Sequence, residues 1–99
     1  MLVAGIDVGS TTTKAVLLDG RAIVGEHAMP TGVDLALAAE QCLHAACSAA
    51  RAAPEELEAL VATGYGRDRV TRATAKVTEI TCHARGARAL VPWARVVVD

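Results

Sequence analysis

The sequence contains few aromatic residues and no strong excess of either charge. Tyr65 and Trp93 are its only aromatic side chains, so a hydrophobic core must be built from Val, Leu, Ile and Ala. Ten Lys and Arg residues against eleven Asp and Glu give a net charge of −1. Such a balanced surface offers no field to hold a polyanion by counterion release. Nucleic acid is therefore not expected as a partner.

Disulfides and membrane segments are not expected either. The three cysteines, an odd number without a repeated spacing, form no disulfide framework, which agrees with a reducing compartment. The start, MLVAGIDVG, has no basic segment followed by a long apolar one. No uncharged run approaches the roughly 18 residues of a membrane span. We expect a cytoplasmic protein without a membrane partner.

The chain is long enough for one small domain with a single core. The sequence has no internal repeat, no low-complexity segment and no interdomain linker. Apolar runs predict strands at Leu2–Val8 and Lys14–Leu18, and Asp19-Gly20 is a two-residue hairpin signal before a third strand at Arg21–His27. We therefore expect the domain to begin with three antiparallel strands.

The rest of the chain predicts alternating helices and strands. Residues 34–53 have the period of an amphipathic helix that covers the sheet, followed by a short helical turn at residues 54–57. Further elements are predicted at Leu60–Thr63 (strand), Glu79–Leu90 (helix) and Arg95–Val98 (strand). The fold class is α/β with a mixed sheet, in which three antiparallel strands precede strand-helix units. The apolar face of the first helix is expected to contain Leu35, Ala38, Ala39, Cys42, Ala46, Ala49 and Ala50.

The stretch GIDVGSTTTK, residues 5–14, gathers a carboxylate, hydroxyls and an amine at the bend between the first two predicted strands. A Walker A loop needs Gly-Lys-Ser or Gly-Lys-Thr at the start of a helix, and a dinucleotide fingerprint needs three spaced glycines; both are missing. A phosphate can still bind here, because Gly9 permits close approach and successive N–H groups at residues 10–12 form an anion-binding concavity. Lys14 would add positive charge.

Asp7 would repel a bare phosphate. The repulsion disappears if Asp7 faces a Mg²⁺ ion, usually through water, that also bridges the phosphates. The alternative is that Asp7 and the neighbouring hydroxyls are ordinary turn residues bonded to local backbone. Spacing alone does not separate these interpretations. A carboxylate at the end of an apolar strand is costly to desolvate without a partner, which favours the first.

The cysteines and histidines do not have the spacing of a metal site. Cys42 and Cys47 are five residues apart on one predicted helix, so their side chains point about 140° apart and are expected to be core and flank residues. Cys82 and His83 are adjacent on another predicted helix, and the three histidines are scattered. The turn residues Tyr65 and Arg67 either shape a cleft, form a partner surface or end the strand.

The first motif resembles the first phosphate motif of the superfamily that contains acetate kinase, sugar kinases, heat-shock chaperones and actin, whose domains have a ribonuclease H-like fold. ATGYGR at Ala62–Arg67 and EITCHARGA at Glu79–Ala87 resemble signatures of the BadF/BadG/BcrA/BcrD-type ATPases. That family activates 2-hydroxyacyl-CoA dehydratases and includes the ATP-binding subunits of benzoyl-CoA reductase. The resemblance covers essentially the whole chain.

The resemblance implies cofactors and partners. Such activators are homodimers that share a 4Fe-4S cluster and bind ATP with Mg²⁺. An ATP-driven rearrangement lets them pass a low-potential electron to a dehydratase or reductase component. ATP then supplies energy for electron transfer and no phosphoryl group for a metabolite.

The resemblance also implies roles for site residues. Asp7 would organise Mg²⁺ and water, and Asp99 would be a further Mg²⁺-facing carboxylate across the cleft. Glu79 would either orient attacking water or be a helix-capping or surface acid. The residues that would hold the β and γ phosphates are Gly9, Ser10, Thr11 and Thr12, with charge from Lys14.

The family pattern continues after Asp99 with a glycine pair, an acid and a second domain that carries the adenosine site and the cluster cysteines. Residues 1–99 therefore resemble an N-terminal ribonuclease H-like subdomain of an ATPase core that lacks the second domain, and we expect this portion alone to be inactive. Two alternatives are a small-molecule kinase of the same superfamily, which GYGR and TCHARGA disfavour, and a truncated nucleotide-binding or dimerisation module without turnover.

Overall fold

The structure is a computed structural model that describes residues 1–79 and 82. The predicted helix Glu79–Leu90 beyond its first residues, the predicted strand Arg95–Val98 and Asp99 lie outside the described residues. The secondary-structure elements of the described part are, in chain order, β1 (Leu2–Val8), β2 (Thr12–Asp19), β3 (Ala22–Pro30), α1 (Leu35–Ala49), the short 3-10 turn η1 (Pro54–Glu56), β4 (Ala59–Thr63), the 3-10 turn η2 (Arg67–Arg69) and β5 (Ala75–Lys76).

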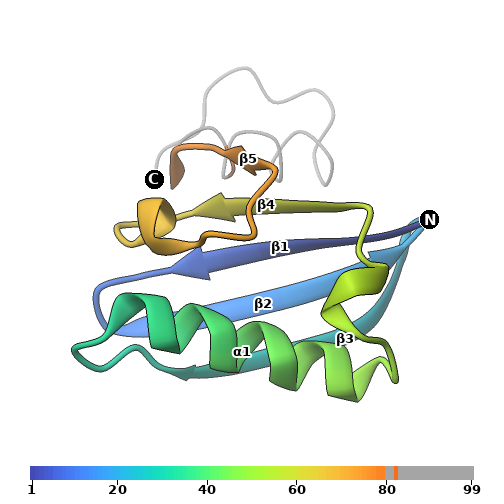
Figure 1. The fold of residues 1–99 in the computed structure, drawn as a ribbon, viewed down its shortest axis with the longest axis horizontal. Helices are drawn as coiled ribbons and strands as arrows, with labels where there is room; N and C mark the ends of the chain where they lie inside the picture. The colour runs from blue at the N-terminus through green and yellow to red at the C-terminus, as the bar shows by residue number, and fades with distance from the viewer. Residues whose placement is uncertain (80–81, 83–99) are drawn as a thin grey trace, which may run out of the picture.

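Within that part of the chain, the strands form one sheet in the order β3-β2-β1-β4-β5, and α1 lies across one face of it (Figure 1). Strand β1 is antiparallel to β2 and parallel to β4. The predicted α/β class, with three antiparallel strands before a parallel one, is confirmed. No helix in residues 1–79 and 82 is both long and apolar enough to cross a membrane.

The hairpin between β2 and β3 differs from the prediction by one residue. Asp19 pairs with Ala22, so the loop consists of Gly20 and Arg21 and not of Asp19 and Gly20. Gly20 has a φ of 63°, a left-handed conformation that glycine adopts without steric cost. Gly20 therefore takes the first position of the loop, and Asp19 remains paired with β3 as the last residue of β2.

Helix α1 begins as predicted and ends earlier. The Asp34 side chain caps the helix by accepting a hydrogen bond of 3.0 Å from the Leu37 N–H. The last helical residue is Ala49 and not Ala53, because Arg51 adopts a left-handed φ of 56° that a helix cannot contain. Pro54 therefore does not determine the end of the helix.

The buried face of α1 consists of small side chains and one leucine. Leu43 and Cys47 belong to it and were missed by the periodicity, whereas Ala49 is exposed. Cys47 is thus a core residue and not a flank residue. This face packs on alternate residues of the sheet. Together with Val70, which follows η2, they form a core of Ala4, Ile6, Val8, Ala15, Leu17, Ala39, Cys42, Leu43, Ala46, Cys47, Leu60, Ala62 and Val70.

Strand β5 was not predicted. It lies parallel to β4 and is held there by Thr74, whose hydroxyl donates to the Leu60 carbonyl and accepts from the Leu60 N–H, both at 3.0 Å. Because β5 is parallel to β4, the chain leaves β5 at the same end of the sheet at which β4 ends. A helical hydrogen bond of 3.1 Å from the Cys82 N–H to the Thr78 carbonyl follows at the start of the predicted second helix.

The close approach of α1 to β3 predicts the effect of adding one methyl group. A Cβ on Gly25 would overlap the Ala46 carbonyl oxygen and lie 2.9 Å from the Ala50 Cβ, so Gly25→Ala should lower the free energy of unfolding by about 1–3 kcal/mol. Gly5→Ala is the control, because a Cβ there meets no atom within 4 Å. Urea titrations followed by circular dichroism would measure both variants, and equal midpoints would contradict the packing described.

Candidate functional site

The candidate site begins where β1 and β4 end side by side. The two strands are parallel, and their register pairs Asp7 with Thr63. Asp7 Oδ1 and Thr63 Oγ1 are both buried and have no hydrogen-bond partner in the described part of the protein. Leaving such an atom unsatisfied costs about 1–3 kcal/mol. Two unsatisfied oxygens in register at the end of two neighbouring strands make this place a candidate ligand site.

The predicted phosphate bend follows directly after β1 at the same edge. The Gly9 N–H donates a hydrogen bond of 3.0 Å to the Thr12 carbonyl and closes the bend. A Cβ on Gly9 would lie 2.7 Å from that carbonyl oxygen, so the turn requires glycine here. Ser10 and Thr11, the two central residues of the bend, are exposed. The bend predicted from the sequence is therefore present and accessible.

A buried threonine beyond β3 supports this bend from behind. The Thr31 hydroxyl donates to the Gly9 carbonyl at 2.8 Å, and the Thr31 N–H donates to the Thr11 carbonyl at 2.8 Å. The Thr31 hydroxyl also lies 2.8 Å from the Thr13 hydroxyl. Thr31 and Thr13 are 4% and 0% exposed, and the bond between their hydroxyls is buried.

The GYGR turn packs on the end of β1. Gly64 has a φ of 90°, and a Cβ there would overlap Asp7 Oδ1 and lie 2.6 Å from the Val8 carbonyl oxygen. The Gly66 N–H donates to that carbonyl at 2.8 Å. The Arg67 guanidinium donates to the Gly64 carbonyl at 3.0 Å, which closes the turn. Tyr65 is 75% exposed. The first two motifs of the sequence thus form a single site.

The remaining predicted site residues are placed as follows. Lys14 is the β2 partner of Asp7, so both side chains project from the same face of the sheet. Glu79 is exposed and follows β5, the strand parallel to β4, on the side of the sheet where β1 and β4 end with Asp7 and Thr63. Asp99 lies outside the described residues. The structure therefore brings Asp7, Lys14 and the bend of residues 9–12 together.

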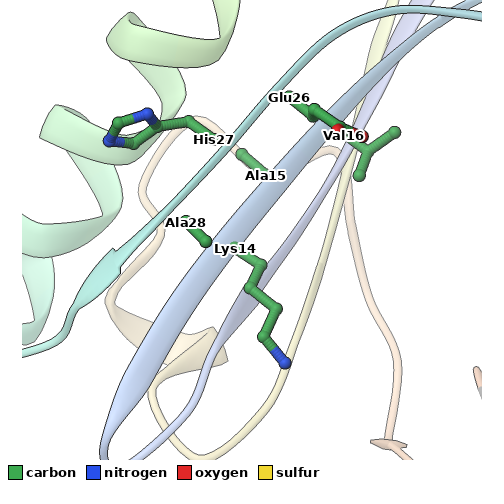
Figure 2. Close-up of a pocket in the computed structure, with 6 residues that line it drawn as sticks. All are labelled: Lys14, Ala15, Val16, Glu26, His27 and Ala28. Atoms are coloured by element: carbon green, nitrogen blue, oxygen red, sulfur yellow. The ribbon is translucent and has the colours of Figure 1, made fainter.

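A shallow hollow of about 440 Å³ runs along β2 and β3. Figure 2 shows that Lys14 and His27, two of its lining residues, point to opposite sides of the sheet, with His27 directed toward α1. Lys14 is the only lining residue that also belongs to the predicted phosphate motif. The hollow therefore extends away from the bend along the strands.

The two cysteines of α1 are buried thiols of low reactivity. Burial raises the pKa of the Cys42 and Cys47 thiols, so both remain protonated at neutral pH. The Cys42 thiol donates weakly to the carbonyls of Thr13 and His27, at 3.6 and 3.4 Å. Among residues 1–79 and 82, no three His, Cys, Asp or Glu side chains lie close enough together to hold a metal ion.

Sequence reasoning missed three residues of this site, all of them threonines. Thr63 was predicted only as the end of a strand, although a polar residue that ends one parallel strand beside Asp7 on the next was an available signal. Thr13 lies inside the predicted motif, but its bond with Thr31 gave no local signal, because the hydroxyl pair joins residues 18 positions apart.

The strand order, the polar bend and the glycine turn define the class of protein. They are the features of an actin-like ATPase domain with a ribonuclease H-like fold. A likeness in fold alone extends to ROK hexokinase from Thermus thermophilus, with a TM-score of 0.72 at 16% identity over 89% of this chain and 38% of that chain.

A sequence model of the BadF/BadG/BcrA/BcrD ATPase family matches residues 4–99, and the chain belongs to this family. It is 39% identical to the activator of lactoyl-CoA dehydratase from Anaerotignum propionicum, over 100% of this chain and 38% of that protein. The chain therefore spans little more than a third of the length of such relatives.

Two solved structures have the same fold at higher identity. Component A of (R)-2-hydroxyglutaryl-CoA dehydratase from Acidaminococcus fermentans matches with a TM-score of 0.85 and 30% identity, over 95% of this chain and 37% of that chain. The activator of 2-hydroxyisocaproyl-CoA dehydratase from Clostridium difficile, with bound ADPNP, matches with a TM-score of 0.83 and 33% identity, over 96% of this chain and 35% of that chain.

The contact of Gly64 with Asp7 predicts a large effect of a small substitution. Gly64→Ala combines a left-handed φ with overlap of Asp7 Oδ1 and the Val8 carbonyl, so it should lower stability by more than about 2 kcal/mol. Gly20→Ala is the matched control, because its φ is also positive but no atom lies within 4 Å of its Cβ. Thermal melts that show equal losses for the two variants would contradict this packing.

The unsatisfied Thr63 hydroxyl predicts a stabilising substitution. Thr63→Val keeps the shape and removes the orphaned oxygen, so it should raise the free energy of unfolding by about 1 kcal/mol. Thr74→Val removes a hydroxyl that is bonded to both backbone groups of Leu60, and it should lower that free energy by about 1 kcal/mol. Chemical denaturation of the ligand-free chain measures both, and a destabilised Thr63→Val variant would mean that the hydroxyl has a partner within the chain.

Proposed function

We propose that this chain binds the phosphates of Mg-ATP at the bend of residues 9–12, as part of an ATPase that activates a 2-hydroxyacyl-CoA dehydratase. The observation that carries the proposal is the pair of buried oxygens of Asp7 and Thr63 without partners, next to an accessible bend. The names of the relatives support it, since they are dehydratase activators and one was solved with ADPNP.

The residues at this edge fit a magnesium ion. Mg²⁺ usually keeps several waters and is held by one or two carboxylates together with substrate phosphates, so one orphaned carboxylate oxygen beside a hydroxyl is a suitable donor set. Asp7 would hold the ion through water, with Thr63 as a hydroxyl partner and Asp99 as the second carboxylate. The bound ion would neutralise charge on the phosphates.

The chain's own groups would bind and orient the nucleotide. The bend of residues 9–12 would hold the β and γ phosphates through hydrogen bonds donated by its hydroxyls and by the backbone N–H groups of residues 10–12, since the Gly9 N–H is bonded to the Thr12 carbonyl. Lys14 would add a positive charge from β2. Glu79, at the same sheet edge, would accept a hydrogen bond from the attacking water and orient it.

In the complete protein, we propose that ATP hydrolysis drives a low-potential electron to a dehydratase or benzoyl-CoA reductase component, within a cytoplasmic homodimer. This chain's residues do not fit the 4Fe-4S cluster of such a system. A cluster shared by two protomers requires two thiolates from each, whereas two of the three cysteines of this chain, Cys42 and Cys47, are buried with raised pKa values. The cluster would therefore be held outside residues 1–99.

Calorimetric titration of the 99-residue chain with ATP, with and without Mg²⁺, tests the phosphate site. Wild type should bind in a Mg²⁺-dependent manner, and Asp7→Asn should weaken binding by about tenfold or more, because it removes the charge that faces the ion. Glu26→Gln is the matched control, since Glu26 is an exposed carboxylate on β3 away from the bend.

Failure of the wild type to bind would contradict the proposal for this chain. Equal affinities of wild type and Asp7→Asn would locate the nucleotide elsewhere. Loss of binding on chelation of Mg²⁺, together with unchanged binding by Glu26→Gln, would support it.

A further inference from the structure

Thr31 contacts the phosphate bend at two points although it lies well beyond it in the sequence. Its hydroxyl holds the Gly9 carbonyl and its N–H holds the Thr11 carbonyl, each at 2.8 Å. The two carbonyls belong to the first and third residues of the bend. One side chain and its own backbone therefore fix the orientation of two peptide groups in this short segment.

The orientation of these carbonyls determines the orientation of two amides. A trans peptide is planar, so its C=O and the following N–H point in opposite directions. No peptide bond in the described residues is cis. Because the Gly9 and Thr11 carbonyls point to Thr31, the N–H groups of Ser10 and Thr12 point away from it. These are two of the amides predicted to bind phosphate.

The position of Thr31 is itself fixed by three elements. It directly follows β3, whose last residue Pro30 is in register with Thr12 of β2. The Thr13 hydroxyl, 0% exposed, bonds the Thr31 hydroxyl from β2. Since Thr31 donates its only hydroxyl proton to Gly9, Thr13 must donate to Thr31. The Cys42 thiol of α1 then contacts the Thr13 carbonyl. The bend is thus attached to the rigid part of the fold.

We propose that Thr31 is a positioning residue of the phosphate site, which directs the N–H groups of Ser10 and Thr12 toward the phosphate oxygens of a nucleotide. This inference rests on the proposed function. Bonds between backbone N–H groups and charged phosphate oxygens depend strongly on alignment, so loss of the Thr31 hydroxyl reduces nucleotide affinity as well as stability.

Three variants separate positioning from simple stabilisation. Thr31→Val keeps the shape without the hydroxyl, and Thr31→Ser keeps the hydroxyl. Thr74→Val removes a hydroxyl that also makes two hydrogen bonds, both to the backbone of Leu60, away from the bend. The measurements on the 99-residue chain are calorimetric titration with Mg-ADPNP, and amide nitrogen-proton spectra of Ser10 and Thr12.

Thr31→Val should weaken Mg-ADPNP binding by about tenfold, Thr31→Ser by less than about threefold, and Thr74→Val should leave it unchanged while it lowers the melting temperature. The amide signals of Ser10 and Thr12 should move in Thr31→Val and stay in place in Thr74→Val. This combination of results would support a positioning role.

Equal affinities of wild type and a folded Thr31→Val variant would overturn this inference and leave the proposed phosphate site standing. Equal losses of affinity in Thr31→Val and Thr74→Val would also overturn it, because both losses would then reflect stability. Absence of Mg-ADPNP binding by wild type would instead overturn the proposed function, and the ligand-directed part of this inference with it.

Discussion

The pairing of β1 with a strand on each side is the constraint on which the site depends. Its antiparallel partner β2 makes the chain reverse through the bend, and its parallel partner β4 brings a second strand end to the same edge. A one-residue slip in either pairing would turn Asp7 to the other face or separate it from Thr63. The core side chains of β1, among them Ile6 and Val8, oppose such a slip because they are buried under α1.

The glycines of the second motif are explained by what lies next to them. Gly64 and Gly66 approach the end of β1 so closely that side chains at these positions would occupy the space of Asp7 and Val8. The turn therefore lies against the buried Oδ1 of Asp7. Burial of Asp7 costs free energy in the ligand-free chain, and a bound cation would recover it. At Asp7, the arrangement that would favour binding of a cation lowers the stability of the ligand-free chain.

Much of the fold was predictable because its signals are local. The hairpin strands followed from apolar runs, and Asp34 marked the start of α1. The end of α1 was mispredicted because Arg51 adopts a left-handed conformation usually left to glycine. β5 is too short for a periodic pattern and is defined by its pairing with β4. For the site, the bend was predictable from its residue types. The role of Thr31 depends on hydrogen-bond partners that only the folded chain brings near, and that of Thr63 on the parallel pairing that sets it beside Asp7.

The order of these pairings along the chain bears on how the protein folds. β1, β2 and β3 are consecutive, so the bend and its support by Thr31 arise from contacts between neighbours in the sequence. The contact of Asp7 with the GYGR turn requires closure of a long loop that contains β2, β3 and α1. Pairings of this kind carry the larger entropic cost and form slowly. The half of the site that is proposed to bind phosphate is therefore expected to form early, and the half that is proposed to face a cation to be completed late.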